Sequence, residues 1–223
     1  KYTRMLDSDD IFPLDSTQKM VQLAEELSAD MVYGTFTKTG KEPTELEHEF
    51  MNDNFTYDFD KDALRTVLTG RFTRMGQLIR TEVLQKAGGA DERVFIQDES
   101  IPLRAALHAR GIVKIHDNVV LVPKELGNFS GNKVQLDNDR FMAYCYMLLD
   151  NPQLPADIRK MLYARALSAY WKFVKKTSRL PYLKPVFFKY LISKVNPQLP
   201  DIQYLKKMQQ IFLKLPNVRR IKN

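Results

Sequence analysis

The stretch Met5-Leu6-Asp7-Ser8-Asp9-Asp10 sets three acidic residues close behind an apolar pair. In an extended chain, residues i and i+2 point to the same side, so Asp7 and Asp9 are expected to present two carboxylates together at the end of a strand. Mg²⁺ takes one or two protein carboxylates and leaves its other positions to phosphates and water. The stretch therefore indicates a clamp for a nucleotide diphosphate. The alternative is an acidic turn that precedes a helix.

The apolar pattern around this stretch predicts an α/β fold followed by a helical C-terminal region. Helical spacing over 20–27 is followed by a strand pattern over 31–36 and by a polar stretch over 38–60 that is expected to be a long loop. Further on, helices are expected at 63–68, from Thr81 to the glycines at 88–89 and at 99–110, and strands at 112–115 and 119–122. Beyond these, only helices are expected, near 134–149, 156–176, 183–194 and 201–214.

Composition excludes several classes of protein. The chain has 223 residues with a single cysteine, Cys145, and 44% of its residues are hydrophobic. These values exclude a disulfide-stapled mini-protein and a disordered chain. The apolar runs are far shorter than the roughly 18 residues of a membrane-spanning helix. A lone thiol without a recognisable export signal favours the cytoplasm.

Charge is distributed unevenly along the chain. The formal net charge is +7, but residues 150–223 carry +13 and residues 1–149 carry −6. Basic and aromatic residues are interleaved over 156–194, which favours docking on an anionic membrane surface, peripherally on the inner face of the plasma membrane. The alternative is that the aromatic residues form the core of a helical subdomain whose charges are solvated.

A second acidic site lies at Gln97-Asp98-Glu99. A carboxylate at the start of a helix can face a cleft while the apolar side of that helix anchors it, and Asp98 could then take the proton from an attacking hydroxyl. The alternative is that Asp98 is a helix N-cap.

These features together resemble a known family. The sequence resembles the second half of a family 2, GT-A type glycosyltransferase, of the kind that builds bacterial polysaccharide or lipopolysaccharide. The resemblance covers about 5–130 and implies a partial GT-A (Rossmann-like) nucleotide-diphospho-sugar transferase fold. It divides the chain into residues 1–130, the C-terminal part of a catalytic domain without its N-terminal nucleotide-binding part, and 131–223, a basic α-helical appendage. The matching segments are 5–10, 71–83, 86–92, 97–104 and 127–130.

The resemblance implies roles for single residues. Asp9 would hold a divalent metal, Mg or Mn, that bridges the donor diphosphate, and Asp7 would approach the ribose or support the metal. Arg71, in a loop over 70–76 that could close over the donor, and Lys124 would also bind the donor. Asp98 matches the catalytic base of inverting members.

The implied reaction is transfer of a sugar from a nucleotide-sugar donor, expected to be a UDP-sugar, to a hydroxyl of a glycan or lipid-linked acceptor. Gln97 departs from the pattern, because many members have an acid at this position. Two other functions stay open. The chain could be a non-catalytic membrane- or nucleic-acid-binding module with a basic helical tail, although no nucleic-acid motif is recognised. It could also be a degenerate transferase that acts as an interaction subunit.

Overall fold

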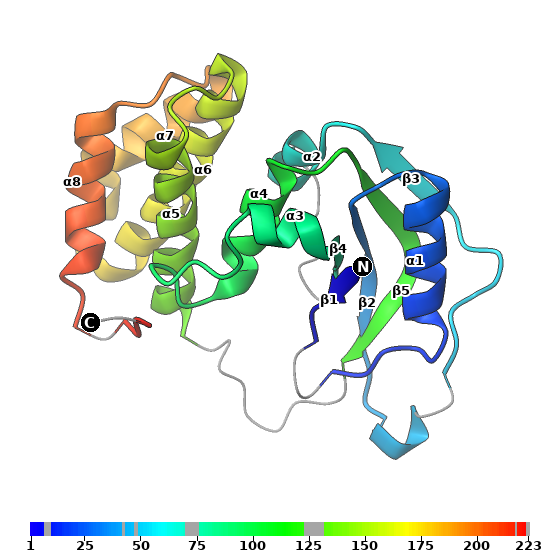
Figure 1. The fold of residues 1–223 in the computed structure, drawn as a ribbon. Helices are drawn as coiled ribbons and strands as arrows, with labels where there is room; N and C mark the ends of the chain where they lie inside the picture. The colour runs from blue at the N-terminus through cyan, green and yellow to red at the C-terminus, as the bar shows by residue number, and fades with distance from the viewer. Residues whose placement is uncertain are drawn as a thin grey trace. The chain divides into compact units, whose positions relative to one another are not determined.

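The structure, a computed structural model, describes residues 1–6, 10–41, 43–46, 49–69, 76–122, 132–216 and 218–221 (Figure 1). Contacts divide the chain into two compact units. The first unit comprises residues 1–89 and 101–128, and the second comprises 90–100 and 129–223. The segment 90–100, which the sequence pattern grouped with the first part of the chain, thus packs with the C-terminal helices.

The first unit is built on a five-stranded mixed sheet. Its strands lie in the order β1-β4-β2-β5-β3, and only β2 and β5 pair in parallel. Because β4 is antiparallel to both β1 and β2, the strands β1, β2 and β5 run in the same direction, and their carboxyl ends point toward one edge of the sheet. The strands are β1 (Tyr2–Arg4), β2 (Met31–Lys38), β3 (Tyr57–Asp60), β4 (Leu78–Arg80) and β5 (Ile112–Val122).

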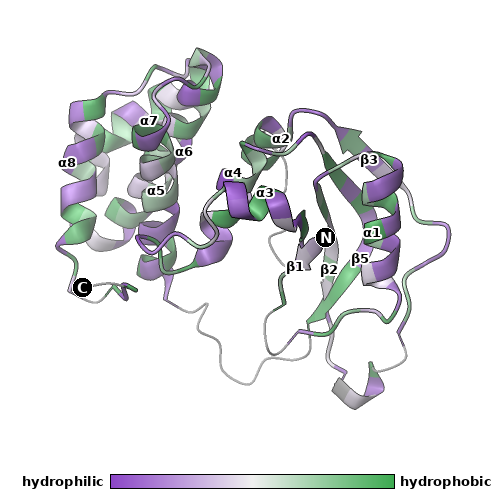
Figure 2. Ribbon diagram, in the orientation of Figure 1, coloured by the Kyte–Doolittle hydropathy of each residue, from purple (hydrophilic) through white to green (hydrophobic). Residues whose placement is uncertain are grey.

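The core of this unit lies between the sheet and helix α1 (Ser16–Glu26). Met20, Leu23 and Ala24 of α1 pack against the apolar strand residues, and Figure 2 shows the hydrophobic character of β5. Burial of these side chains is the main stabilising contribution to such a layer. The other helices of the unit are the 3₁₀ helix Pro43–Glu45, α2 (Ala63–Thr69), α3 (Thr81–Lys86) and α4 (Ile101–Ala106).

Three expectations about this unit differ from the structure. The two strands expected at 112–115 and 119–122 are one strand, β5, whose pairing with β2 shifts register between Tyr33 and Phe36. The expected loop over 38–60 contains β3, an exposed edge strand of only four residues in an otherwise polar stretch. The helix expected at 99–110 is shorter, because a 3₁₀ helix, Gln97–Glu99, precedes α4.

The second unit is helical, as the sequence predicted. Phe141 of α5, Tyr170 and Phe173 of α6, and Phe212 of α8 form an aromatic core, with ring centroids as close as 4.8 Å. This packing confirms the core alternative for these aromatic residues of the C-terminal region. The helices are α5 (Lys133–Asp150), α6 (Ala156–Thr177), the 3₁₀ helix Pro181–Leu183, α7 (Pro185–Val195) and α8 (Ile202–Leu213). In the described part of the chain, no helix has the length and apolarity to cross a membrane.

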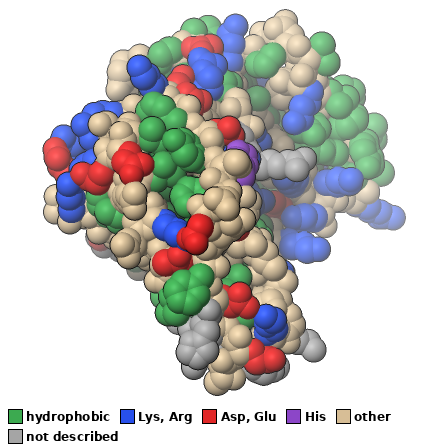
Figure 3. All heavy atoms as spheres, turned by 90° about the vertical axis from the view of Figure 1, so that its right-hand side faces the viewer, with side chains coloured by type: hydrophobic (Ala, Val, Ile, Leu, Met, Phe, Trp, Pro, Cys, Tyr) green, Lys and Arg blue, Asp and Glu red, His purple; other side chains and the backbone are tan. Residues whose placement is uncertain are grey.

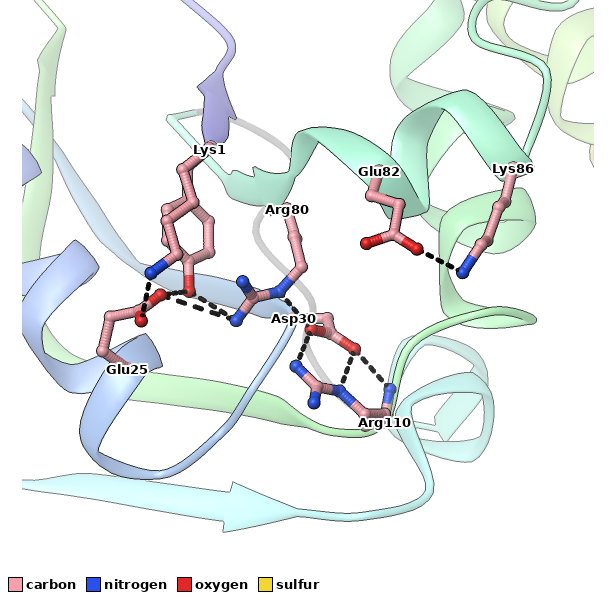
Figure 4. Close-up of polar contacts among 8 residues, drawn as sticks. Lys1, Glu25, Asp30, Arg80, Glu82, Lys86 and Arg110 are labelled. Atoms are coloured by element: carbon pink, nitrogen blue, oxygen red, sulfur yellow. Dashed lines mark hydrogen bonds and ion pairs between the residues drawn. The ribbon is translucent and has the colours of Figure 1, made fainter.

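A buried acid joins three strands at the edge of the sheet where β2 and β5 begin. Asp30, which is only 2% exposed, accepts hydrogen bonds from Arg80 Nε at 2.6 Å and from Arg110 Nη2 at 2.7 Å (Figure 4). Burial opposes ionisation of Asp30, but the hydrogen bonds from the Arg110 side chain and backbone and from Arg80 outweigh it. The pKa of Asp30 is therefore lowered from 3.8 to about 2. The ion pairs hold the start of β2 to the end of β4 and the start of β5.

Replacing Asp30 with asparagine is expected to lower the free energy of unfolding at neutral pH by about 2 kcal/mol. Because the pKa of Asp30 is lower in the folded state, its contribution is full above the unfolded value of 3.8 and is lost as the pH falls toward about 2. Urea denaturation at several pH values measures this. The control Glu82→Gln breaks an exposed pair with Lys86 and should leave stability unchanged. A difference between wild type and Asp30→Asn that is as large at pH 2 as at pH 7 would contradict this account.

Candidate functional site

The ends of the acidic stretch are fixed by two strands of the sheet. On one side, Met5 N donates to Gln77 O at 3.2 Å, which continues the pairing of β1 with β4. On the other side, Ile11 bridges Leu121 of β5 through two backbone hydrogen bonds of 2.9 and 2.8 Å. The chain thus leaves the sheet after β1 and returns to it at the end of β5. Residues 7–9 lie outside the described residues, but both of their anchors are at the carboxyl edge of the sheet.

Gly76, the first described residue after 70–75, lies at the same edge of the sheet. It has a φ of +61° and precedes β4, whose first residue, Leu78, pairs with Arg4. A Cβ on Gly76 would lie 2.1 Å from Val120 Cγ2 and 3.3 Å from Phe12 Cε1. Any other residue would therefore clash with β5 and strain the backbone.

The segment 123–131 also starts at this edge, because it follows Val122, the last residue of β5. Val122 O accepts a hydrogen bond from Thr39 N at 2.9 Å, so the exits of β2 and β5 are held together. Residues 123–131 themselves lie outside the described residues.

Four of the five predicted site residues lie outside the described residues: Asp7, Asp9, Arg71 and Lys124. Their individual positions therefore stay predictions. Their segments nevertheless begin or end at one edge of one sheet, although they are far apart in the sequence. This convergence could not be read from the spacing of the motifs.

Arg4 is the residue that joins these anchors, and the sequence analysis missed it. At the end of β1, its Nε donates to Gly76 O at 3.2 Å and its Nη2 donates to Val119 O at 2.6 Å. Its Nη1 donates to Ser16 Oγ at 2.8 Å and to Thr17 Oγ1, at the start of α1. One guanidinium thus joins β1, β5, α1 and Gly76. No local pattern identifies it, because β1 is the short polar stretch Tyr2–Arg4 and the partners of Arg4 lie 12 to 115 positions away in the chain.

The positive charge of Arg4 is surrounded by an aromatic ring, carbonyl groups and hydroxyl groups. Its guanidinium carbon lies 3.5 Å from the centre of the Phe12 ring. Burial lowers the pKa of Arg4 to about 10. Within the described residues, its hydrogen-bond acceptors are carbonyls and hydroxyls and none is a carboxylate. A buried positive charge favours negative charge nearby, so this edge of the sheet suits an acidic segment and an anionic ligand.

Asp98, the fifth predicted residue, belongs to the second unit. It is half-buried within the 3₁₀ helix Gln97–Glu99. Gln97, the departure from the family pattern, uses its side-chain amide to hold the preceding turn. Its Oε1 accepts from Asp91 N at 2.8 Å, and its Nε2 donates to Asp91 O at 2.9 Å and to Val94 O. A carboxylate could not donate these bonds, which explains physically why an amide serves at position 97.

Helix α5 supports the other side of the same 3₁₀ helix. Arg140 Nε donates to Glu99 Oε1 at 2.9 Å, and Ile96 N donates to Asp139 Oδ2 at 3.0 Å. Burial raises the pKa of Asp139, although hydrogen bonds from Gln135 and Asn138 and from the backbone act against this. The residues on both sides of Asp98 are therefore hydrogen-bonded to the preceding turn and to α5, which fixes the backbone at Asp98.

The described residues contain no group of three or more His, Cys, Asp or Glu side chains that could hold a metal ion. The predicted metal ligand, Asp9, is outside the part of the chain that was searched.

Replacing Arg4 with methionine is expected to lower the free energy of unfolding by about 2–4 kcal/mol, because it leaves buried carbonyls without donors. Urea denaturation measures the loss. Arg65→Met is the matched control, because Arg65 is 45% exposed and pairs with Asp62 three residues before it; a change within about 1 kcal/mol is expected for it. Equal effects of the two substitutions would show that Arg4 does not organise this edge.

Replacing Asp139 with alanine is expected to cost about 1–3 kcal/mol, because Ile96 N and the side-chain amides of Gln135 and Asn138 lose their acceptor. Thermal unfolding with calorimetry measures this. On the same helix, Asp150 pairs with Arg93 in an exposed position, and Asp150→Ala should cost less. A larger loss for Asp150→Ala would contradict the supporting role of Asp139.

Comparisons with known proteins bear on the fold. No protein-family model matches the chain, and no curated protein matches it in sequence. The chain is similar to a crystal structure of residues 1–349 of TarS from S. aureus in complex with UDP-GlcNAc, with a TM-score of 0.59 and 15% identity over 95% of this chain and 65% of that one. A second structure of TarS 1–349 gives a TM-score of 0.55 and 14% identity over 95% and 64% of the two chains. The chain thus spans slightly less than two thirds of the TarS chain that it matches. The likeness shows a glycosyltransferase-like fold, a partial GT-A fold followed by a helical region.

Proposed function

We propose that the chain is part of a glycosyltransferase that moves a sugar from a nucleoside-diphosphate donor to a hydroxyl of a glycan or lipid-linked acceptor. The observation that carries this proposal is the convergence, at one edge of the sheet, of the anchors of the segments 7–9, 70–75 and 123–131. The likeness of the fold to TarS 1–349 supports it. Because one TarS crystal structure contains UDP-GlcNAc, a UDP-sugar is the donor we propose.

At the donor end, Asp9 and Asp7 would hold a divalent cation, Mg²⁺ or Mn²⁺. These two residues suit such a cation, because paired carboxylate oxygens bind a hard cation that also binds phosphate oxygens. When bound, such an ion neutralises charge on a departing diphosphate. Arg71 and Lys124 would contact the donor phosphates, and the buried cation of Arg4 would favour both the carboxylates and the anionic donor at this edge.

At the acceptor end, Asp98 would accept the proton of the attacking hydroxyl as its oxygen bonds to the anomeric carbon. The bond between that carbon and the diphosphate oxygen breaks, and the nucleoside diphosphate leaves with the electron pair. Attack from the face opposite the leaving group inverts the anomeric centre. The rigid attachment of the segment 96–99 to α5 supports this role, because a general base needs a fixed position.

The proposed acceptor is a bacterial surface glycan, polysaccharide or lipopolysaccharide, or a lipid-linked precursor of one. The proposed place of the reaction is the cytoplasmic side, with the protein peripheral on the inner face of the plasma membrane. A nucleotide-sugar donor and a lipid-linked acceptor meet at such a surface.

Two substitutions in the protein at its full natural length separate the proposed roles. Asp9→Asn is expected to weaken Mn²⁺-dependent binding of UDP, measured by calorimetry, by at least tenfold, a loss of about 1.4 kcal/mol. Asp98→Asn is expected to leave UDP binding unchanged and to lower the rate of UDP release from UDP-GlcNAc by about 10²–10⁴-fold.

Glu82→Gln, which alters an exposed pair on α3, is the control and should change neither quantity. Binding of UDP that persists in full after chelation of divalent ions would contradict the metal clamp. Full turnover of the Asp98→Asn variant would contradict the proposed base.

A further inference from the structure

Helix α7 has apolar side chains on two opposite faces. One face packs on α6, where Phe187 and Tyr190 lie 4.9 and 6.1 Å from Trp171 between ring centroids, and where Val186 is buried. The opposite face consists of Phe188, Leu191, Ile192 and Val195, which we call the α7 face. These residues are 54, 45, 53 and 90% exposed.

The spacing of the α7 face is that of a single helical stripe. Positions 188, 191, 192 and 195 follow the pattern i, i+3, i+4 and i+7, so the four side chains lie side by side along the helix. The preceding 3₁₀ helix adds Tyr182 and Leu183, which are also exposed. Buried Ser193 lies on the covered side, so the helix keeps a polar residue inside and large apolar residues outside. A contiguous apolar surface of this kind marks a docking surface rather than ordinary scatter.

The charges around the α7 face identify the occupant. Residues 158–200 contain ten Lys or Arg and no Asp or Glu. Lys184 precedes Phe188 by one helical turn, and Lys194 follows Leu191 by three residues, so both border the face and both are exposed. Figure 3 shows hydrophobic side chains with Lys and Arg beside them toward its right-hand edge.

We infer that the α7 face docks on an anionic lipid bilayer. Aliphatic and aromatic side chains would enter the boundary between headgroups and acyl chains, while the bordering lysines contact lipid phosphates. A second copy of this chain suits the face less well, because it would bring Lys184 and Lys194 against the same two lysines of the other copy. Nucleic acid would satisfy the lysines but would leave Leu191, Ile192 and Val195 without an apolar partner. This inference rests on the membrane location in the proposed function and names the face that would make the contact. It needs no donor or metal, so vesicle binding can fail while the proposed reaction holds.

Co-sedimentation with vesicles tests the inference in the full-length protein. Binding to phosphatidylcholine vesicles that contain phosphatidylglycerol is expected to be at least about tenfold tighter than binding to pure phosphatidylcholine, and to weaken as salt is added. Phe188→Ser/Ile192→Ser should lower binding by at least about tenfold. Its control is Ile211→Ser/Leu213→Ser on α8, which changes two apolar residues of similar exposure and should bind as wild type.

Two double variants with equal net charge test the contribution of the bordering lysines. Lys184→Glu/Lys194→Glu should lower binding more than Lys206→Glu/Lys207→Glu, which reverses two exposed lysines of α8. Unchanged thermal unfolding of each variant confirms that the fold is kept.

Four results would overturn the inference. The first is full vesicle binding by Phe188→Ser/Ile192→Ser, and the second is an equal loss from both lysine pairs. The third is a stable dimer that does not bind vesicles and that Phe188→Ser/Ile192→Ser dissociates. The fourth is duplex DNA binding that exceeds vesicle binding and that the lysine variants abolish.

Discussion

The guanidinium of Arg4 is the interaction on which the arrangement of the sheet edge depends. It reaches from the end of β1 to Gly76, to β5 and to the start of α1. In each of these contacts, the guanidinium donates a hydrogen bond to an oxygen. A hydrogen bond to a charged donor is stronger than a neutral one, and a buried donor fixes geometry more tightly than an exposed one. The acidic stretch follows Arg4 directly in the chain. A residue of opposite charge that is fixed to the sheet thus precedes this stretch.

The two units use buried acids in different ways. Asp30 stays ionised because two arginines bond it, and it closes the edge of the sheet where β2 and β5 begin. Burial raises the pKa of Asp139, and the hydrogen bonds from amides and backbone donors do not offset this effect. Asp139 supports the 3₁₀ helix that carries Asp98. The difference follows from the partners, since arginine stabilises the ionised form more than an amide does. Both acids are structural. Asp139 positions the segment that carries Asp98, whereas Asp30 lies at the edge of the sheet opposite the carboxyl ends of β1, β2 and β5.

Much of the fold could be predicted from the sequence, because apolar periodicity is local. The helices of the C-terminal region and strand β2 follow directly from it. Strand β3 was missed although Tyr57 and Phe59 alternate with two aspartates as in a half-buried strand. The alternation covers only four residues, and this edge strand gains its stability from pairing with β5. The role of Arg4 was also out of reach, because its hydrogen-bond partners are brought together by the tertiary fold. Gln97 instead bonds to the turn just before it, and its role depends on the conformation of that turn. Of the predicted site residues, only Asp98 lies in the described part of the chain, and its support by α5 depends on contacts between residues more than 40 positions apart.

We propose that the carboxyl edge of the sheet holds a nucleoside diphosphate through the acidic stretch. A crystal structure of the full-length protein with UDP and Mn²⁺ would test this proposal. A metal ion is expected at the Asp9 carboxylate and the UDP phosphates, between the end of β1 and the end of β5. A nucleotide bound away from this edge, or bound here with Asp9 turned from the ion, would contradict it.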